Sequence, residues 1–244
     1  MILTLLVGNT NTRLAVFDRR RLVRVRVIPS GRIDDYLNKI KLSPRIEGAV
    51  MASVVPKKTL PLFRILNRQV PTLLVNSRTP VPLKFNYDRK LLGADRLAVA
   101  AGGYARFQRE LVIIDFGTAI TFNLVNRYGF FSGGPIVPGP DLMLDALAQG
   151  TGRLPRVHWS ARARTICTRT KPAIQAGVFN LLIGGLSRIL EKVVAEAGGN
   201  TQLVVGTGGA ARRFRRYLDI RVVDQNLASR GLAEIYYFNR RQDE

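Results

Sequence analysis

Apolar and polar residues alternate along the first part of the chain in the pattern of a β-meander. The apolar run over residues 1–7 predicts a buried strand, and residues 13–18 predict a second strand that returns beside it. Residues 22–28 alternate arginine and valine, which is the period of a strand with one exposed face. Between the first two strands, residues 8–12 read GNTNT, and these small and polar side chains favour a turn.

Helices and strands alternate over the rest of the first half. Ser30 is placed to cap a short helix, and Pro80 and Pro82 mark residues 77–92 as an irregular connection. From the spacing of apolar residues we expect a strand at 47–55, a helix at 56–68, a strand at 72–76 and a helix at 94–108.

The second half restarts the pattern with the segment LVIIDFGT at residues 111–118. Its apolar run predicts a strand buried on both faces of a parallel or mixed sheet. A hairpin across residues 126–129 follows, and Pro172 is placed to open a long helix that Thr170 can cap and residues 198–200 end. Glycine and proline residues at 133–135 and 138–140 bracket Ile136 and Val137. We also expect a helix at 140–149, strands at 203–205 and 221–223, and helices at 210–218 and 227–238.

The two halves of the chain begin alike. A strand, a glycine turn rich in hydroxyl side chains and two further strands occur at residues 1–28 and again at 111–137. We interpret the chain as two copies of one α/β unit that face each other, each a mixed sheet flanked by helices. The predicted N-terminal lobe is 1–109 and the C-terminal lobe is 110–244. Two glycine turns from two lobes would clamp a polyphosphate, so we expect the active site in the cleft between the lobes.

Length and composition are those of a globular protein. The chain has 244 residues, 46% of them hydrophobic, which is enough for one large domain or two small ones. We see no apolar run of the roughly 18–20 residues that span a bilayer, and no signal-peptide pattern in the first residues. The single cysteine, Cys167, excludes an intrachain disulfide and a zinc site with several cysteines. We therefore expect a cytoplasmic protein without a membrane partner.

The net charge of +21 is unusual and comes from 38 basic against 17 acidic residues. Such a surplus is compatible with a nucleic-acid or other anionic partner, or with a solvated surface rich in arginine. The basic residues are spread along the chain, and no binding module that interleaves basic and aromatic residues is visible. We therefore give nucleic acid less weight than a small-molecule partner. Local clusters lie at residues 19–21, at Arg162 and Arg164, and at Arg212, Arg213, Arg215 and Arg216.

The candidate chemistry lies in the turns. Asp115 stands at the end of a strand and is followed by Gly117 and Thr118. An acid that could bind a cation is therefore next to a turn that could bind phosphate oxygens. The same residues would also suit a simple Asx-type turn. Asp95 precedes Arg96 at a predicted helix start, where an acid could serve as a general base or only stabilise the helix dipole.

Taken in order, these segments resemble the type III pantothenate kinases of the acetate kinase–sugar kinase–Hsp70–actin superfamily. The resemblance extends over nearly the whole chain. Residues 7–12 resemble the first phosphate loop of the family, residues 93–96 (GADR) its pantothenate-binding motif, and residues 115–118 its second phosphate loop. The remaining matches are Gly133 and Gly134 with Pro138 and Gly139, Thr170 with Gln175 and Gly177, and the adenosine-side turn GTGG at residues 206–209.

The resemblance implies two ribonuclease H-like or actin-like lobes and the ATP-dependent phosphorylation of pantothenate, the first step of coenzyme A biosynthesis. It also implies ATP with Mg²⁺, a monovalent cation (K⁺ or NH₄⁺) and a homodimer. Asp95 would be the catalytic base, Arg96 would contact the substrate carboxylate, and Asp115 would hold the monovalent cation. The implied substrate contacts are Tyr87, Gly93, Ala94, Asp95, Arg96 and Thr170. The implied ATP contacts are Leu6, Val7, Gly8, Asn9, Thr10, Asn11, Thr12, Arg13 and Thr118.

One departure from the family pattern affects the chemistry. The family has an aspartate directly before the Val-Gly of its first loop, where this chain has Leu6. Leucine cannot ligate Mg²⁺ directly or through water, and Asp18 is at the far end of the return strand. We predict weak or absent turnover, which leaves open an inactive homologue with a regulatory or nucleic-acid-binding role like that of the related Bvg accessory factors. Smaller departures are Ile120, where the family usually has threonine, and Cys167, Thr168 and Arg169 before Thr170.

A dinucleotide-binding fingerprint is a further alternative. Residues 206–211 fit G-x-G-x-x-A between a predicted strand and helix, and Asp224 follows at a strand end. A dinucleotide-binding half needs more strands and helices after this motif than the sequence offers, so we do not favour it.

Overall fold

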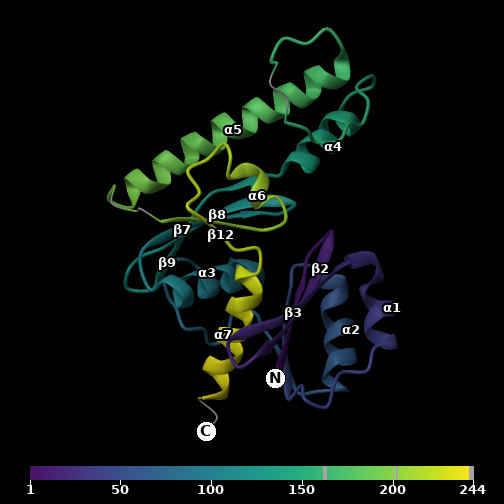
Figure 1. The fold of residues 1–244 in the computed structure, drawn as a ribbon, viewed down its shortest axis with the longest axis vertical. Helices are drawn as coiled ribbons and strands as arrows, with labels where there is room; N and C mark the ends of the chain where they lie inside the picture. Colours follow the sequence, from purple (N-terminus) through teal and green to yellow (C-terminus); the bar gives the residue numbers. More distant parts are fainter. Residues whose placement is uncertain (162–163, 200, 202, 242–244) are drawn as a thin grey trace. The chain divides into compact units, whose positions relative to one another are not determined.

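The structure is a computed structural model that describes residues 1–161, 164–199, 201 and 203–241. Arg162 and the expected helix end at residue 200 lie outside the described residues. The elements, shown in Figure 1, are β1 (Ile2–Val7), β2 (Asn11–Asp18), β3 (Arg21–Pro29), η1 (Ser30–Arg32), α1 (Ile33–Lys39), β4 (Gly48–Ser53), α2 (Pro56–Asn67), β5 (Thr72–Leu74), β6 (Lys84–Phe85), η2 (Arg89–Leu91), α3 (Ala94–Phe107), β7 (Leu111–Phe116), β8 (Ala119–Val125), β9 (Phe130–Gly133), β10 (Ile136–Pro138), α4 (Pro140–Gly150), α5 (Thr170–Glu196), β11 (Val204–Thr207), α6 (Ala211–Phe214), β12 (Val222–Val223) and α7 (Leu227–Arg240).

The first sheet has five strands in the order β3-β2-β1-β4-β5. Strand β1 pairs with β2 in antiparallel and with β4 in parallel orientation. Leu3, Leu5 and Val7 share an apolar cluster with residues of α1 and α2, whereas Ile2 clusters with Ala233 of α7. Because side chains alternate along a strand, the two faces of this sheet are covered by different helices.

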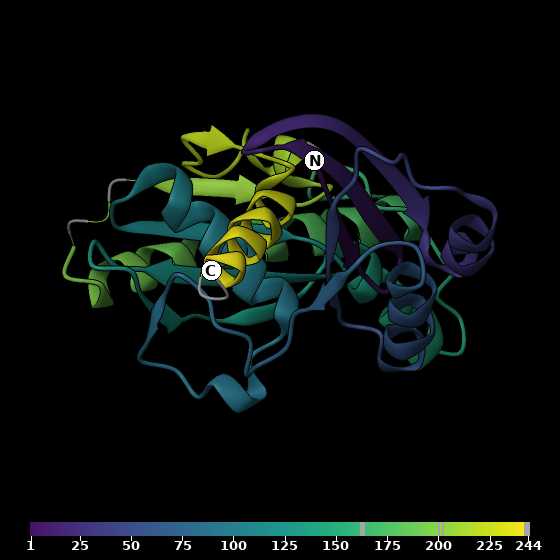
Figure 2. The same cartoon turned by 90° about the horizontal axis from the view of Figure 1, so that it is seen from below.

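Helices α3 and α7 lie side by side (Figures 1 and 2). They cross at glycines. A Cβ atom at Gly231 would collide with the carbonyl oxygen of Ala98, and one at Gly102 would collide with that of Leu227. Only glycine therefore allows this close backbone approach. The crossing fixes the position of α3, whose first turn carries Asp95.

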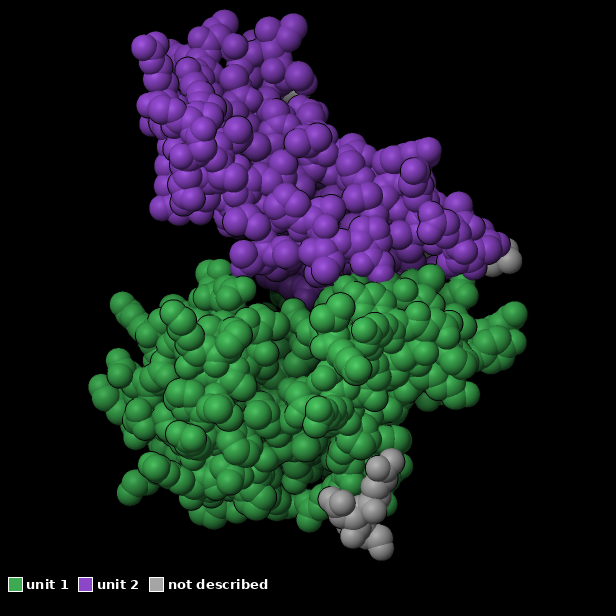
Figure 3. Space-filling view, turned by 180° about the vertical axis from the view of Figure 1, so that it is seen from behind, with its two compact units in different colours: residues 1–111, 123–133, 225–244 green, residues 112–122, 134–224 purple. Residues whose placement is uncertain are grey.

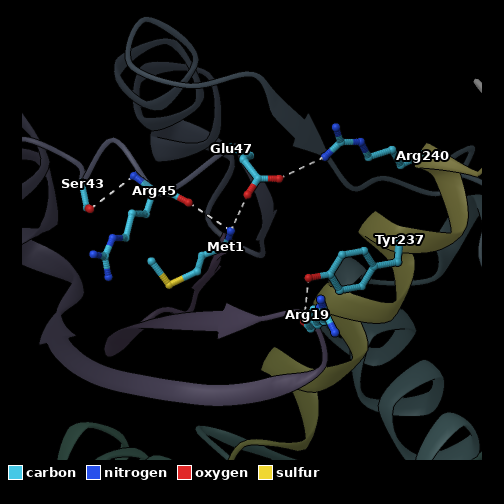
Figure 4. Close-up of polar contacts among 7 residues, drawn as sticks. All are labelled: Met1, Arg19, Ser43, Arg45, Glu47, Tyr237 and Arg240. Carbon is cyan, nitrogen blue, oxygen red and sulfur yellow. Dashed lines mark hydrogen bonds and ion pairs between the residues drawn. The ribbon is translucent and has the colours of Figure 1, made fainter.

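The C-terminal turns of α7 are tied to the first sheet by polar contacts, drawn in Figure 4. The Tyr237 hydroxyl donates to the carbonyl oxygen of Arg19 at 2.6 Å, in a turn where Arg19 has a φ of 51°. Glu47 accepts from the amino group of Met1 at 2.7 Å, and Arg240 lies 3.7 Å from its other carboxylate oxygen. These contacts hold α7 against the strands that carry the first glycine turn.

The second sheet repeats the order of the first. Its strands run β12-β11-β7-β8-β9-β6, so β9-β8-β7-β11-β12 corresponds to β3-β2-β1-β4-β5, and β10 pairs with β8. Strand β7 is parallel to β11, just as β1 is parallel to β4. This repeat confirms the predicted class, a mixed α/β fold built from two similar sheets flanked by helices.

The chain forms two compact units, coloured separately in Figure 3. The first consists of residues 1–111, 123–133 and 225–244, and the second of residues 112–122 and 134–224. Strand β8 thus contributes residues to both units. The lobe boundary between residues 109 and 110 stays a prediction.

Several expected elements differ in detail. Helix α6 ends at Phe214 rather than residue 218, although the following turn still buries Leu218. Short elements β6 and η2 occur within the connection that we expected to be irregular. Neither Ser30 nor Thr170 caps a helix: Ser30 begins η1 and Thr170 is itself the first residue of α5. Both cap predictions were wrong because the helices begin at these residues and not after them.

Helix α5 is 27 residues long and has an 18-residue window with a mean hydropathy of 1.4, of which 28% is buried. By length and composition alone it could cross a membrane, which the sequence analysis did not anticipate. Core helices of globular proteins share this composition, so one such helix is weak support for a membrane span.

Candidate active site

The first glycine turn, between β1 and β2, is closed by short hydrogen bonds. The N–H of Gly8 donates to the carbonyl oxygen of Asn11 at 3.1 Å. The hydroxyl of Ser30 donates to the carbonyl oxygen of Gly8 at 2.6 Å and lies 2.9 Å from the hydroxyl of Thr12. Ser30, predicted as a helix cap, instead braces this turn. Asn9, which is exposed, and its neighbours form a polar rim of the kind that can donate to phosphate oxygens.

Leu6 lies two residues before this glycine and offers no acid. It is half-buried and pairs with Arg13 on β2 and with Ala52 on β4. The guanidinium of Arg13 donates to the side-chain oxygen of Asn226 at 2.8 Å, next to the start of α7. Asp18 pairs with Arg21 at the other end of β2, so it does not replace an acid at position 6.

The second glycine turn, between β7 and β8, is closed by backbone groups. The N–H of Gly117 donates to the carbonyl oxygen of Ala119 at 3.2 Å, and that of Gly139 donates to Thr118 at 2.9 Å. A Cβ atom at Gly139 would lie 2.7 Å from the carbonyl oxygen of Gly117, so the segment after β10 must pass close to this turn. Thr118 is exposed to solvent.

Asp115 lies beside the turn that follows β11. Thr207 is its partner in the parallel pairing of β7 and β11. Gly208 has a φ of +86°, and a Cβ atom there would collide with Oδ1 of Asp115 and lie 2.6 Å from the carbonyl oxygen of Phe116. The structure therefore brings together Asp115 and the GTGG turn at the carboxyl ends of two parallel strands, where α/β sheets bind ligands.

A cation bound by Asp115 would need further oxygen ligands. Within the described ranges, no three His, Cys, Asp or Glu residues lie close enough together to hold a metal ion. One carboxylate at a strand end suits a hard cation that takes its remaining ligands from carbonyls, water or phosphates. Asp115 meets that requirement as a single ligand.

Asp95 occupies the first turn of α3, directly after Gly93 and Ala94. Its Oδ1 accepts a hydrogen bond from the backbone N–H of Arg96 at 2.8 Å, so it also serves the helix start as a structural acid would. Burial raises the pKa of the Asp95 carboxyl, while this hydrogen bond and the charge of Arg96 act in the opposite direction. A Cβ atom at Gly93 would lie 2.5 Å from Oδ1, so glycine leaves room for the carboxylate.

Arg96 is 6% exposed and is held by side chains from three other segments. Its Nε donates to Oδ1 of Asn123 at 2.8 Å. Its guanidinium carbon lies 5.7 Å from the ring centroid of Tyr87 and 5.6 Å from that of Phe131, within cation–π range. The two rings meet edge to face at 5.6 Å. Burial lowers the pKa of Arg96, but an arginine remains charged at neutral pH.

Sequence reasoning missed Asn123, Phe131 and the role of Gly133. Asn123 is fully buried on β8 between the apolar residues Phe122 and Leu124, and a polar residue between them was the signal that the sequence offered. Gly133 has a φ of +84°, and a Cβ atom there would lie 2.6 Å from the ring of Tyr87. The ring of Tyr87 therefore packs directly on the backbone of Gly133.

Thr170 is exposed at the start of α5, after the N-cap residue Arg169. Gln175 on the same helix donates to the carbonyl oxygen of His158 at 2.8 Å, which ties His158 to the helix. Thr170 as a substrate contact stays a prediction.

Two cavities lie apart from Asp95 and Asp115, and the second is lined by Pro138 and Gly177 of the family motifs. One, of about 270 Å³, lies between α3 and α7 and is lined by Arg20, Arg106 and Glu234 among others. The second is an apolar groove of about 730 Å³ between α4 and α5. Neither is lined by Asp95 or Asp115, so the polar turns and not these cavities carry the candidate chemistry.

Comparisons with known proteins point to the same family that the motifs resemble. The sequence profile of the type III pantothenate kinases matches residues 2–192. A type III pantothenate kinase of Syntrophus aciditrophicus is 33% identical over 98% of this chain and 100% of its own length.

Two solved structures share the fold at lower identity. A Campylobacter jejuni protein assigned to the Baf family of transcriptional activators has a TM-score of 0.65 at 20% identity, covering 98% of this chain and 100% of that one. The ROK hexokinase of Thermus thermophilus has a TM-score of 0.51 at 17% identity, covering 98% and 99%. The chain belongs to the type III pantothenate kinase family.

Proposed function

We propose that this protein transfers the γ-phosphoryl group of ATP to the primary hydroxyl of pantothenate, which gives 4'-phosphopantothenate in the first step of coenzyme A biosynthesis. The observation that carries the proposal is the pair Asp95 and Arg96 at the start of α3. It joins a carboxyl whose pKa is raised by burial to a buried, fixed guanidinium. Pantothenate needs both groups, because it has a hydroxyl to deprotonate and a carboxylate to bind.

In this mechanism the protein positions the reactants and neutralises charge. The backbone N–H groups of the two glycine turns and the hydroxyl of Thr118 would hold the β- and γ-phosphates. Asp95 would accept the hydroxyl proton as the oxygen attacks the γ-phosphorus and the bond to ADP breaks. Arg96 would bind the carboxylate, and Tyr87 and Thr170 would complete the substrate contacts. Mg²⁺ bound to ATP would neutralise phosphate charge, with K⁺ or NH₄⁺ beside Asp115.

Leu6 favours a second candidate, a weakened or inactive homologue with a regulatory role. The absence of an acid at position 6 removes one group that could organise Mg²⁺ and phosphate. The charge of +21 would suit a polyanionic partner such as DNA. A DNA-binding titration tests this candidate, since real phosphate contacts weaken steeply as salt rises. No binding at low salt would exclude it.

A homodimer in the cytoplasm is part of the proposal. The groove between α4 and α5 leaves apolar side chains in solvent, among them Leu142 at 46% and Leu181 at 64% exposure. Apolar surface of this kind is usually covered by a partner. A second copy of the chain would cover it and would also account for the low burial of α5. Sedimentation of the native chain and of Leu181→Glu tests this, with a monomer expected for the variant.

An assay of ADP release with ATP, Mg²⁺, pantothenate and added K⁺ or NH₄⁺ tests the enzymatic proposal. Asp95→Asn should lower kcat by about 10²- to 10⁴-fold, because a general base contributes that much. Robust pantothenate phosphorylation by this variant would exclude Asp95 as the base.

The pH dependence follows from the raised pKa of Asp95. Only the ionised carboxylate accepts a proton, so activity should fall on the acid side at a pH above the ordinary aspartate range. The folded state also holds this proton more tightly than the unfolded state, so ionisation destabilises the fold as pH rises through the folded pKa. Asp95→Asn should therefore unfold at a higher temperature than the native chain at neutral pH, and this difference should vanish in acid.

A further inference from the structure

Phe116 lies where the turn after β7 contacts the turn after β11. Its carbonyl oxygen accepts a hydrogen bond from the N–H of Ala210 at 3.4 Å, and a Cβ atom at Gly208 would lie 2.6 Å from that oxygen. The side chain of Phe116 is 2% exposed. Since Phe116 stands directly between Asp115 and Gly117, a shift of its backbone would move both of these residues.

The ring of Phe116 stacks on the ring of Phe214. The two ring centroids are 4.7 Å apart, and the ring planes differ by 16°. Phe214 is the last residue of α6, the short helix that follows the GTGG turn, and its side chain is fully buried. One ring thus belongs to the strand that leads into the second glycine turn, and the other to the helix that leaves the GTGG turn. Close packing of the two rings therefore fixes the distance between the two turns.

Trp159 also stacks on Phe214. The two rings are 5.5 Å apart at an interplanar angle of 27°, and the guanidinium carbon of Arg213 lies 5.9 Å from the Trp159 ring centroid. The indole Nε1 of Trp159 is buried and has no hydrogen-bond partner among the described residues. A buried N–H without a partner is unfavourable, so ring contacts and not a hydrogen bond keep Trp159 in this position. Phe214 is therefore in contact with two aromatic rings, which restrict its movement.

We propose that Phe214 is a positioning residue for ATP: by stacking on Phe116 it holds the GTGG turn at the distance from the 115–118 turn that the nucleotide requires. The inference rests on the proposed function, because it takes both turns as parts of the ATP site. Phe214 is fully buried, so it acts through Phe116 and the backbone of the turns. Loss of its ring should weaken the binding of ATP and leave the binding of pantothenate unchanged, since Asp95 and Arg96 belong to α3.

The substitution Phe214→Leu removes the ring and keeps an apolar side chain in its place. Isothermal titration of the full chain with a non-hydrolysable ATP analogue and Mg²⁺ should give a Kd at least about tenfold higher than the native value, because misplacing a positioned group by about 1 Å costs up to about 10²-fold. Titration with pantothenate should give the native Kd. Where turnover is measurable, KM for ATP should rise while KM for pantothenate stays the same.

A double substitution and a matched control test the route of the effect. Phe116→Leu should raise the Kd for the ATP analogue as Phe214→Leu does, and the double variant should show less than the product of the two effects, because both substitutions break the same stack. Phe179→Leu is the control. In the described part of the chain, Phe179 contacts the rings of Trp159 and Tyr217, at 6.3 Å and 5.0 Å, and not those of the stack on Phe116. This variant should keep the native Kd.

The outcomes separate the inference from the proposed function. If the native chain binds the ATP analogue and Phe214→Leu binds it equally well, Phe214 does not position ATP and the proposed function stands. An equal loss of affinity in Phe179→Leu would also overturn the inference, since general loosening of the packing would then explain the effect. If the native chain binds no ATP analogue, the proposed function fails and the inference with it.

The half-buried Trp159 provides a second variant in case Phe214→Leu does not fold. Trp159→Leu removes one of the two rings that restrict Phe214, so the Kd for the ATP analogue should rise and that for pantothenate should not. An unchanged Kd for the ATP analogue in Trp159→Leu would then overturn the inference.

Discussion

The turn after β1 and the turn after β7 occupy equivalent places in two sheets of the same strand order, and they differ in chemistry. Each has a glycine whose N–H donates to a carbonyl oxygen further along the turn. Two residues before that glycine, the second turn has Asp115 and the first has Leu6. The fold thus contains the closed glycine turn twice and an acid two residues before it once.

The two turns are also supported in different ways. Side-chain hydroxyls of Ser30 and Thr12 brace the first turn. The second turn is instead supported by close packing of glycine backbone, since Gly139 lies against Thr118 and Gly208 lies against Asp115. The side-chain hydrogen bonds at the first turn can be removed one at a time, whereas the close backbone packing at the second turn leaves no space for an added atom. The comparison therefore predicts different responses to small substitutions.

The largest effect should come from making the second turn resemble the first. Asp115→Leu removes the remaining acid, and loss of one preorganised electrostatic group costs about 10²- to 10³-fold in kcat/KM. It should also abolish the protection by ATP with Mg²⁺ against thermal unfolding, which is measurable even where turnover is weak. Asp115→Asn, which has the same shape, separates charge from packing. Full ATP protection of both variants would contradict the role of Asp115.

The reverse substitution should restore activity. Leu6→Asp gives the first turn its acid, on the strand face next to Arg13, and should raise kcat by about tenfold to a hundredfold. Leu6→Asn is the control, since it is polar without charge and should not raise kcat. Native turnover that is already robust and is unchanged in Leu6→Asp would show that position 6 carries no catalytic role in this chain.

The packing of the second turn can be tested without substituting Asp115. Gly208→Ala forces a side chain into a left-handed backbone and against Asp115, so the free energy of unfolding should fall by about 1–3 kcal/mol. Gly209→Ala is the matched control, because a Cβ atom there meets no neighbour within 4 Å. Urea unfolding of the two variants measures the difference. Equal stability would mean that the turn relaxes without cost.

The smallest effect should come from the brace of the first turn. Ser30→Ala removes the hydrogen bond to Gly8, and the free energy of unfolding should fall by about 1–2 kcal/mol, with a higher KM for ATP. Ser43→Ala is the control. The Ser43 hydroxyl accepts a long hydrogen bond of 3.3 Å from the N–H of Arg45 at an exposed position (Figure 4). An unchanged KM for ATP in Ser30→Ala would show that the brace supports the fold and not the phosphate site.

Much of the fold could be predicted from local patterns. Alternation over residues 22–28 and the apolar run at 111–114 gave strands close to β3 and β7, because burial on one face or both leaves a period in the sequence. The repeated order of turn and strand predicted two similar sheets. The short helix at α6 was overestimated, since the apolar spacing continues through a turn that also buries its side chains.

The residues of the candidate site also differ in whether the local sequence could identify them. Glycine and acid motifs identified Asp95, Asp115 and both turns as sequence features. Nothing local could show that Ser30 serves Gly8 or that Asn123 holds Arg96, because these partners come from other strands and helices. Single polar residues in apolar stretches indicate that such a partner exists and give no information on which one.

The sequence by itself determined the periods of burial, the two glycine turns and the apolar residue at position 6. Tertiary structure decided which distant groups complete each turn and how a buried positive charge is held by a neutral amide. The physical reason is the range of the interactions. Backbone preference and amphipathic period act within a few residues of each other, whereas hydrogen bonds and close packing between strands and helices exist only once the chain has folded.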